Sequence, residues 1–456
     1  MYFEQFYLGC LSHASYLLGS DGVAVVVDPQ RDVDIYLNAA AEHGLAIRHI
    51  FETHLHADFV SGHKELAQRT GARIYIGERA GAGFPHVGVR EGFRLKFGAG
   101  QIRVLETPGH TPESICLLIF DPERSADNPW AVLTGDTLFI GDVGRPDLSD
   151  AYTPQQLAGL LFDSLHRKLL PLPDGVLVYP AHGAGSLCGR NLRDQRYSTI
   201  GTERLTNPAL QIKDRGQFVL GMTSKLPPRP QYFAQDAALN REGAAALDQL
   251  PPLPAWSAAE VGRLRDRGTV VLDTRPAAAF ADGHVPGSVN IGLTGQFASW
   301  AGTVIGLSTP IVLVDDTPER IAEARMRLAR VGIENVVGSL DGGVRGFQDA
   351  GFELARMPQV TVRELRDRLD QFLVLDVRRG PEWQAAHIEG AIWHPLDDFP
   401  RELPPLPKDA PIALHCRSGY RSMLAASLLR RAGYQNVTNV VGGFDAWQAE
   451  SLPAAA

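Results

Sequence analysis

The stretch Thr53–Gly62 (Thr-His-Leu-His-Ala-Asp-Phe-Val-Ser-Gly) limits the folds that this chain can adopt. It follows a short apolar lead-in at 48–51, which we predict to be the end of a strand. Two imidazoles and one carboxylate therefore sit on one tight turn at the carboxyl end of a strand. Nitrogen and oxygen ligands so spaced can converge on a divalent metal. A lone histidine would be an ordinary core or surface residue, whereas three potential ligands within five residues predict a metal site.

The later candidate ligands also lie just beyond apolar runs. They are His110 after Ile102–Glu106, Asp136 after Ala131–Thr134, and His182 after Val176–Tyr179. Such runs predict strands, and chemistry in proteins usually sits on loops that a stiff sheet carries. The sequence therefore predicts a sheet scaffold with the candidate ligands on its connecting loops.

Length and charge exclude several classes of protein. A chain of 456 residues is long enough for about three domains. The net charge of −8 gives no sign of nucleic acid or an anionic membrane as a partner. No run approaches the roughly 18 apolar residues of a membrane span, and the first residues lack the features of a signal peptide.

The cysteines predict a reducing compartment. Cys10, Cys116, Cys188 and Cys416 are too few and too scattered for a disulfide framework, so we expect a cytoplasmic protein. The first three are expected to be small core or surface residues rather than catalysts.

The ordered motifs His54-x-His56-x-Asp58, His110, Asp136 and His182 resemble the metallo-β-lactamase superfamily. The resemblance covers roughly the first half of the chain and rests on four separate motifs. It implies an αββα sandwich with a metal at one edge of the paired sheets.

Phe59 departs from the pattern of the two-metal hydrolases in that superfamily, which carry His directly after the Asp. A phenyl ring cannot ligate, so the second metal site is incomplete. The remaining residues resemble the mononuclear iron branch, the persulfide dioxygenases. This resemblance implies one Fe(II) per chain, held by His54, His110 and Asp136. Two imidazoles and one carboxylate form a facial triad that leaves positions open for dioxygen and a substrate thiolate.

The same resemblance gives the neighbouring residues supporting roles. His56 and Asp58 would hydrogen-bond around the ligands, and His182 would lie near the metal without binding it. The alternative is that His56 also ligates, which would give a zinc hydrolase site.

Gly141–Leu148 resembles the Gly-Arg-x-Asp segment of the dioxygenase branch. Arg145 would pair either with a carboxylate of the carrier thiol or with Asp147 in a structural ion pair, and both options stay open. Arg190 and Tyr197 are weaker candidates for binding a carboxylated thiol.

Proline-rich runs at Pro227–Pro230 and Pro251–Pro254 are typical of a connector on the surface, which we expect over Asn207–Ala255. We predict a metal domain with its connector over residues 1–250.

The rest of the chain is an internal repeat, with copies predicted at 251–355 and 356–456. Val270–Arg275 corresponds to Leu373–Arg378, and each copy has Gly-Gly before its last predicted helix. Apolar strands that alternate with helices indicate a parallel sheet covered on both faces. The pattern resembles two α/β rhodanese domains over residues 256–456.

The two copies differ at one decisive position. In the second copy, Cys416 follows a strand and precedes a helix predicted to begin near Met423, where backbone N–H groups favour a thiolate. Arg417 and Arg421 add positive charge. The first copy has Asp315 there, which cannot carry sulfane sulfur, so we expect an inactive spacer or docking element. Four residues separate Cys416 from Arg421, one fewer than in the related phosphatases, which favours sulfur transfer over phosphoryl hydrolysis.

These resemblances imply one function. The chain would oxidise a small thiol persulfide with O2 to sulfite and thiol, a step in sulfide detoxification, and transfer sulfur at Cys416 to form or use thiosulfate. A zinc thioester hydrolase of the glyoxalase II type with accessory rhodanese domains is the alternative enzyme. A sulfur-sensing or sulfur-relay protein is a third class. The sequence does not identify the carrier thiol (glutathione, coenzyme A or another), the direction of sulfur flow, or whether the chain forms a homo-oligomer.

Overall fold

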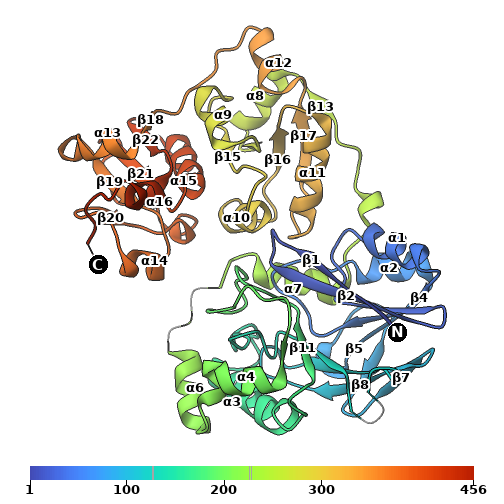
Figure 1. Ribbon diagram of the computed structural model, residues 1–456. Coiled ribbons are helices and arrows are strands. Elements are labelled where there is room, and N and C mark those ends of the chain that lie inside the picture. The colour runs from blue at the N-terminus through green and yellow to red at the C-terminus, as the bar shows by residue number, and fades with distance from the viewer. Residues whose placement is uncertain (126–127, 225, 227–228, 456) are drawn as a thin grey trace. The chain divides into compact units, whose positions relative to one another are not determined.

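A computed structural model describes residues 1–456 except 126–127, 225, 227–228 and 456 (Figure 1). The chain forms two compact units. The first comprises Met1–Leu250 with Ala329–Gly332, and the second comprises Pro251–Leu328 with Ile333–Ala456. Among the described residues, no helix has both the length and the apolar character needed to cross a membrane.

Two six-stranded sheets form the centre of the first unit. The first sheet has the order β1-β2-β3-β4-β5-β6, with strands Tyr2–Leu8, His13–Ser20, Val23–Val27, Ala46–Glu52, Arg73–Gly77 and Val87–Val89. The second has the order β12-β11-β10-β9-β8-β7. From β7 to β12 its strands are Arg94–Phe97, Gly100–Glu106, Ile115–Phe120, Ala131–Gly135, Leu177–Pro180 and Ser198–Thr199.

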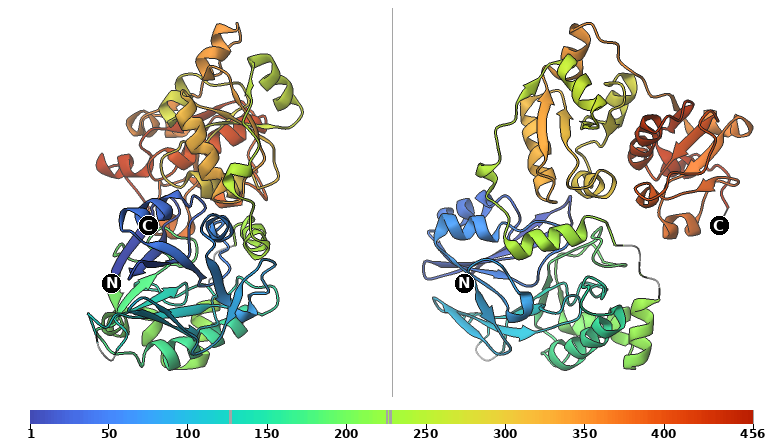
Figure 2. Two further views of the ribbon diagram at one scale, coloured as in Figure 1. Left: turned by 90° about the vertical axis from the view of Figure 1, so that its right-hand side faces the viewer. Right: turned by 180° about the vertical axis from the view of Figure 1, so that it is seen from behind.

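Helices cover the outer face of each sheet. The helices α1 (Asp34–Glu42) and α2 (His63–Thr70) pack on the first sheet, where their apolar side chains join those of β3 to β5. The helices α3 (Pro154–Ser164) and α6 (Arg215–Thr223) pack on the second. A separate apolar core, which includes Phe51, lies between the sheets. Figure 2 shows these layers from two further sides. The unit is the αββα sandwich that the motifs predicted.

The segment after β12 is more ordered than the predicted surface connector. It contains α4 (Ile200–Thr206), α5 (Pro208–Gln211), α6 and α7 (Phe233–Glu242). Buried side chains on α6 and α7 contribute to the core of the first unit, which explains why this segment is not a simple linker. Pro227 and Pro228 lie outside the described residues.

Each half of the second unit has a five-stranded parallel sheet. The first copy has the order β13-β17-β16-β14-β15. From β13 to β17 its strands are Ala255–Trp256, Val270–Asp273, Val289–Asn290, Ile311–Val314 and Val336–Leu340. The second copy repeats this order as β18-β22-β21-β19-β20. From β18 to β22 its strands are Gln359–Val360, Leu373–Asp376, Ile392–Trp393, Ile412–His415 and Val437–Val440.

Among the described residues, four helices of the first copy have counterparts in the second, and only α10 (Phe297–Val304) has none. The first copy contains α8 (Ala258–Asp266), α9 (Ala277–Asp282), α10, α11 (Pro318–Ala329) and α12 (Gly343–Asp349). The second contains α13 (Val362–Arg366), α14 (Gly380–Ala385), α15 (Tyr420–Arg431) and α16 (Gly443–Ala449). Short helical turns lie at Glu78–Ala80, Leu165–Leu169, Leu247–Gln249, Leu369–Gln371 and Leu396–Asp398. Matched strands and helices bear out the predicted pair of rhodanese-like folds.

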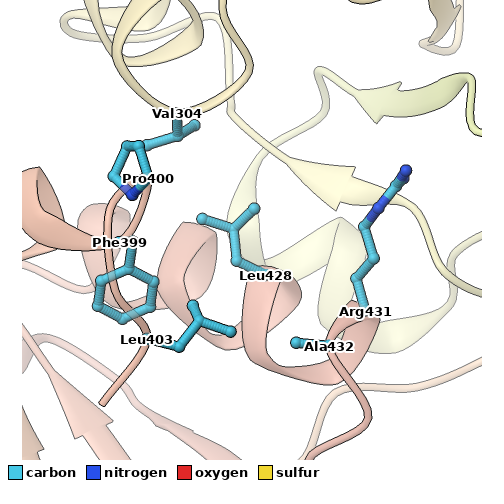
Figure 3. Close-up of a pocket in the computed structure, with 7 residues that line it drawn as sticks. All are labelled: Val304, Phe399, Pro400, Leu403, Leu428, Arg431 and Ala432. Carbon is cyan, nitrogen blue, oxygen red and sulfur yellow. The ribbon is translucent and has the colours of Figure 1, made fainter. Parts of the chain in front are cut away.

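A cavity of about 320 Å³ lies within the second unit (Figure 3). Val304 at the end of α10 lines it together with Phe399, Leu403 and Leu428 of the second copy. Arg431, the last residue of α15, also borders this cavity, whereas Cys416 precedes the first turn of that helix. A helix of 12 residues is about 18 Å long, so the cavity is remote from the cysteine.

Candidate functional site

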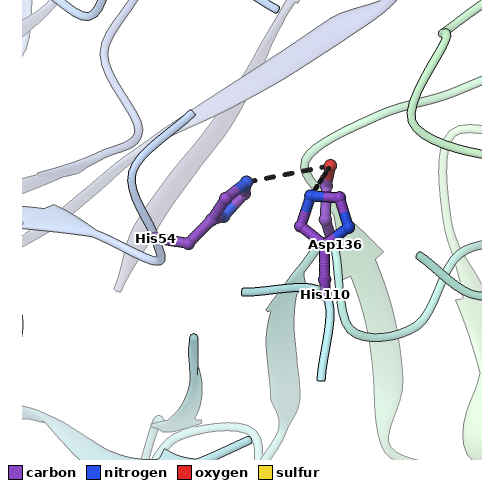
Figure 4. A group of neighbouring side chains, drawn as sticks. All are labelled: His54, His110 and Asp136. Atoms are coloured by element: carbon purple, nitrogen blue, oxygen red, sulfur yellow. Dashed lines mark ion pairs between the residues drawn. The ribbon is translucent and has the colours of Figure 1, made fainter. Parts of the chain in front are cut away.

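Three residues from three strand ends meet in the first unit (Figure 4). His54 follows β4, His110 lies on the loop after β8, and Asp136 follows β10. The Nε2 atoms of His54 and His110 lie 3.8 Å and 3.4 Å from Oδ2 of Asp136. All three side chains are buried. The structure thus brings together the three residues that the resemblance implied as metal ligands.

Neighbouring groups orient both imidazoles. Nδ1 of His110 donates to the carbonyl oxygen of Arg145 at 2.9 Å. Nδ1 of His54 lies 3.0 Å from the hydroxyl of Thr53, which donates its proton to Asp28 at 2.8 Å. The hydroxyl therefore accepts from His54, and the Nε2 atom of each ring keeps its lone pair for the site.

Gly144 makes the contact of His110 with Arg145 possible. A Cβ atom at this position would lie 2.0 Å from the Asp136 carbonyl oxygen and 2.8 Å from Nδ1 of His110. Any larger residue would displace the loop that carries the Arg145 carbonyl. This close approach gives a physical reason for the glycine in the Gly-Arg-x-Asp segment.

The electrostatics of the triad suit a cation. Burial lowers the pKa of His54 and of His110, which favours the neutral ring in both. A neutral imidazole can offer a nitrogen lone pair to a metal. Burial opposes ionisation of Asp136, but the nearby histidines outweigh it and hold its pKa well below the ordinary value. Among the described residues, Nε2 of His110 and Oδ2 of Asp136 are buried without a hydrogen-bond partner. These two unpartnered atoms, together with Nε2 of His54, fit a divalent transition metal.

His56 faces a different group from the triad. Its Nε2 atom lies 3.2 Å from Oδ1 of Asp28 and 3.7 Å from Oε2 of Glu52. Burial lowers its pKa, but the two carboxylates outweigh this effect and raise it. This arrangement agrees better with a supporting role than with a fourth ligand of a zinc hydrolase.

His182 links the triad to Asp58. Its Nδ1 atom lies 2.8 Å from Oδ1 of Asp136, and its Nε2 atom lies 2.8 Å from Oδ2 of Asp58. The two carboxylates overcome the effect of burial and raise the pKa of His182 well above the ordinary value. The ring therefore spans the two carboxylates.

Two residues beside the site escaped the sequence reasoning. Cys188 is buried, and its sulfur lies within 4.8 Å of ligand atoms of Asp58 and His182. Burial raises the pKa of its thiol well above the ordinary value. His13 is also buried, with its ring centre 4.0 Å from that of Phe59. Cys188 follows His182 on the same loop, and this proximity in the sequence could have indicated that it lies beside the site.

Phe59 forms an apolar wall of the site. It is fully buried, and its ring centre lies 4.4 Å from that of His56. The backbone around it is held by the Asn240 side chain, which donates to the carbonyls of His56 and Phe59, each at 2.7 Å. The phenyl ring thus occupies a place that the two-metal pattern gives to an imidazole.

The three substrate-binding candidates differ in availability. Arg145 is buried and makes two hydrogen bonds to Asp147, at 2.7 Å and 2.9 Å, so the structural ion pair is the one observed. Arg190 is exposed and contacts Met222 and the carbonyl of Gly221 on α6. Tyr197 is 56% exposed.

The second unit contains the cysteine loop, between β21 and α15. The helix α15 begins at Tyr420, earlier than the predicted start near Met423. Gly419 precedes it in a left-handed conformation, and its N–H donates to Sγ of Cys416 at 3.2 Å. Cys416 is buried, so its sulfur lies at a protected helix N-terminus.

Both arginines of the cysteine loop are paired with carboxylates. Arg421 makes two hydrogen bonds to Glu382, at 2.6 Å and 2.7 Å. Arg417 lies 3.2 Å from Asp445 on the exposed surface. The loop is therefore less positively charged than its two arginines suggest, and Glu382 is a neighbour that the motif alone did not reveal.

Known families match most of the chain. The metallo-beta-lactamase superfamily model matches residues 8–182, and the rhodanese-like domain model matches residues 257–350 and 361–450. The mitochondrial persulfide dioxygenase ETHE1 of Mus musculus is 31% identical over 228 residues, which cover 48% of this chain and 79% of that protein. A hydroxyacylglutathione hydrolase of Francisella tularensis is 34% identical over 173 residues, covering 38% of this chain and 63% of that protein.

A solved structure matches beyond the first unit. The crystal structure of a metallo-beta-lactamase from Staphylococcus aureus has a TM-score of 0.67 and 33% identity. The match covers 75% of this chain and 98% of the other. Together with the buried triad and the paired parallel sheets, these similarities show that the chain belongs to the persulfide dioxygenase family of the metallo-beta-lactamase superfamily and carries two rhodanese-like domains.

Proposed function

We propose that this chain is an iron persulfide dioxygenase with an attached sulfurtransferase. The first reaction is RSSH + O2 + H2O → RSH + SO3²⁻ + 2 H⁺, with RSSH a low-molecular-weight thiol persulfide. The observation that carries the proposal is the buried group of His54, His110 and Asp136, in a chain 31% identical to a persulfide dioxygenase.

The triad would hold one Fe(II) per chain. A bound Fe(II) supplies open coordination positions and the redox chemistry for dioxygen and a persulfide. The surrounding residues do the rest: the Arg145 carbonyl and the Thr53 hydroxyl keep the two imidazoles in the ligating tautomer. Phe59 leaves the second metal position short of a ligand.

The pair of His182 and Asp58 is our candidate for managing protons. Nε2 of His182 lies 2.8 Å from Oδ2 of Asp58, close enough for a proton to pass between them. The reaction releases two protons for each persulfide oxidised, and this pair is buried beside the triad. Asp58 also has an Oδ1 atom without a hydrogen-bond partner among the described residues.

The second reaction takes place at Cys416 in two balanced steps. In the first, Cys416–S⁻ + RSSH → Cys416–SS⁻ + RSH, so the thiolate attacks the outer sulfur and the thiol leaves with the proton. In the second, Cys416–SS⁻ + SO3²⁻ → Cys416–S⁻ + S2O3²⁻. The Gly419 N–H and the start of α15 stabilise the anionic sulfur. Running the steps in reverse would use thiosulfate.

The carrier thiol would approach from the side of Arg190 and Tyr197. Both are exposed in the first unit, and a guanidinium is suited to a carboxylate. Glutathione persulfide is a suitable probe because its thiol carrier has two carboxylates.

Anaerobic purification with metal quantitation, followed by oxygen uptake with glutathione persulfide, tests the proposal. We expect about one iron per chain and sulfite formation that matches the oxygen consumed. His110→Ala should lower iron content roughly tenfold or more, because it removes a ligand. His86→Ala, at an exposed histidine of the same unit, is the control and should retain iron.

The alternative predicts different results. Two zinc ions per chain, thioester hydrolysis and no oxygen uptake by iron-loaded protein would favour the glyoxalase II type of enzyme. Full metal binding without any turnover would favour a sensing or relay protein.

A further inference from the structure

The copy without a cysteine contacts the cysteine loop of the other copy within the second unit. Tyr420 is the first residue of α15 and lies directly before Arg421. Its hydroxyl donates to the carbonyl oxygen of Gly292 in the first copy at 2.8 Å. A Cβ atom on Gly292 would lie 3.7 Å from the Tyr420 ring, so the ring packs against this backbone.

Two further contacts connect the copies near the same loop. The backbone N–H of Asn290, on β15, donates to the buried Ser427 hydroxyl of α15 at 3.1 Å. The Arg379 guanidinium lies 5.3 Å from the ring centre of Trp300, on α10. Arg379 also donates its backbone N–H to Glu382, the residue that binds Arg421. The first copy therefore reaches the cysteine loop through both Tyr420 and Arg379.

Internal bonds of the first copy fix the segment that carries the Gly292 carbonyl. Arg327, on α11, donates to the carbonyls of Leu293 and Gly295. The Asn290 side chain donates to the carbonyls of Asp273 and Arg275, at 3.0 Å and 2.9 Å. Bonds within the first copy thus help to hold this acceptor in place.

We propose that segment 290–295 of the first copy is a positioning element for Cys416. It holds the Tyr420 side chain, and so fixes the start of α15 and the Gly419 N–H that contacts the sulfur. Hydrogen-bond donors aid chemistry when they are fixed in advance around the atom that becomes charged. A loose first turn would lose part of this stabilisation. The inference deepens the proposed sulfur transfer and gives the cysteine-less copy a role in it.

Tyr420→Phe tests the proposal in the full chain because it removes the hydroxyl and keeps the ring. We expect kcat for transfer from glutathione persulfide to sulfite to fall roughly threefold to tenfold, the range for one lost hydrogen bond, with little change in KM for sulfite. The rate of Cys416 alkylation by iodoacetamide, followed on the Cys416 peptide by mass spectrometry, should change as well.

Tyr434→Phe is the matched control. Its hydroxyl is buried and donates to the Pro404 carbonyl at 2.7 Å, entirely within the second copy. It should lower the melting temperature about as much as Tyr420→Phe and leave both kcat and the alkylation rate unchanged.

Arg327→Gln tests the route from the first copy, since its hydrogen bonds go to Leu293, Gly295 and Glu323 of that copy. We expect the same direction of change in kcat and alkylation, roughly twofold to fivefold. The double variant with Tyr420→Phe should be no worse than Tyr420→Phe alone, because both changes interrupt one path.

Unchanged kcat and alkylation in both variants would overturn the inference, as would an equal loss in Tyr434→Phe or additive losses in the double variant. Failure of the proposed function gives a different result: the unaltered chain then transfers no sulfur. In that case the alkylation rates alone decide whether the first copy positions Cys416.

Discussion

The two rhodanese-like copies have the same sheet order. They differ in the loop that follows the middle strand of the sheet, which is β16 in the first copy and β21 in the second. β14 pairs with β16 at Asp273 and Val314, and β19 pairs with β21 at Asp376 and His415. The next residue is Asp315 in the first copy and Cys416 in the second. Each loop then has an arginine five residues later, so the comparison is between equivalent positions.

In the first copy, the Asp315 side chain accepts the hydrogen bonds that the loop and its neighbours donate. Asp315 accepts hydrogen bonds from Nε of Arg320 at 2.6 Å, from the Thr274 hydroxyl at 2.5 Å and from the Asp316 N–H at 2.7 Å. The carboxylate thus takes the place that a bound anion or persulfide would need. This explains in physical terms why the copy is expected to be inactive.

In the second copy, the arginine is bound outside the loop. Arg421 binds Glu382 on α14, and the Gly419 N–H donates to the Cys416 sulfur. The ring pairs Phe280 with His284 and Trp383 with His387 align the two copies, so Glu382 corresponds to Ala279. The second copy therefore differs from the first at two positions, a thiol in the loop and a carboxylate beside it.

The largest expected effect comes from removing the thiol. Cys416→Ser should lower sulfur transfer roughly a thousandfold or more, because no other group there can carry the sulfur. Oxygen uptake with glutathione persulfide should remain. Asp315→Asn is the matched change in the other copy. It should alter sulfur transfer less than about twofold, because the first copy would act only by positioning the cysteine loop. Transfer that survives in Cys416→Ser would contradict the assignment.

A smaller effect is expected when the arginine loses its outer partner. Glu382→Gln should lower sulfur transfer roughly tenfold and the free energy of unfolding by about 1–2 kcal/mol, since it breaks a partly buried charge-assisted pair. Asp445→Asn, which breaks the exposed pair with Arg417, should change the free energy of unfolding by less than about 0.5 kcal/mol. Urea unfolding and transfer assays measure both.

The same pair gives a pH dependence. Burial raises the pKa of Glu382, but Arg421 outweighs it and holds the pKa below the ordinary 4.5. A depressed pKa means that the stabilisation is present above pH 4.5 and is lost as the pH falls through the folded-state value. The stability gap between the unaltered chain and Glu382→Gln should therefore close in acid. A gap that widens below that pH would contradict the assignment of this ion pair.

The smallest expected effect is a gain. Asp315→Cys alone should load little sulfur, because Arg320 then has no carboxylate partner. Adding Ala279→Glu should restore that partner and raise persulfide labelling at residue 315 to roughly a few per cent of that at Cys416. Equal labelling in the single and double variants would show that the outer carboxylate is not needed.

Sequence reasoning worked best where one motif contained both the strand and the ligand. Apolar runs placed His54, His110 and Asp136 at strand ends, and the paired folds make those ends meet. The internal repeat likewise predicted two parallel sheets. In these cases a local pattern determines the result, because the direction of a strand fixes where its loop lies.

It worked less well for partners distant in the sequence. Cys188 and His13 reach the site from separate segments, and Glu382 lies 39 residues before Arg421. Helical structure over the expected connector was missed because proline-rich runs hid the short helices between them. Aligning the two copies could have revealed Glu382, because the equivalent residue of the first copy is Ala279.

Asn240 has a consequence for how the metal domain can be divided. Its side chain holds the His56 and Phe59 carbonyls and accepts the Ser61 N–H at 2.8 Å, although it lies beyond the 8–182 stretch that matches the superfamily. The helix α7 thus helps to hold the turn that carries His54 and His56. If the proposed iron site is correct, a chain shortened before α7 should bind less iron although His54, His110 and Asp136 are all present.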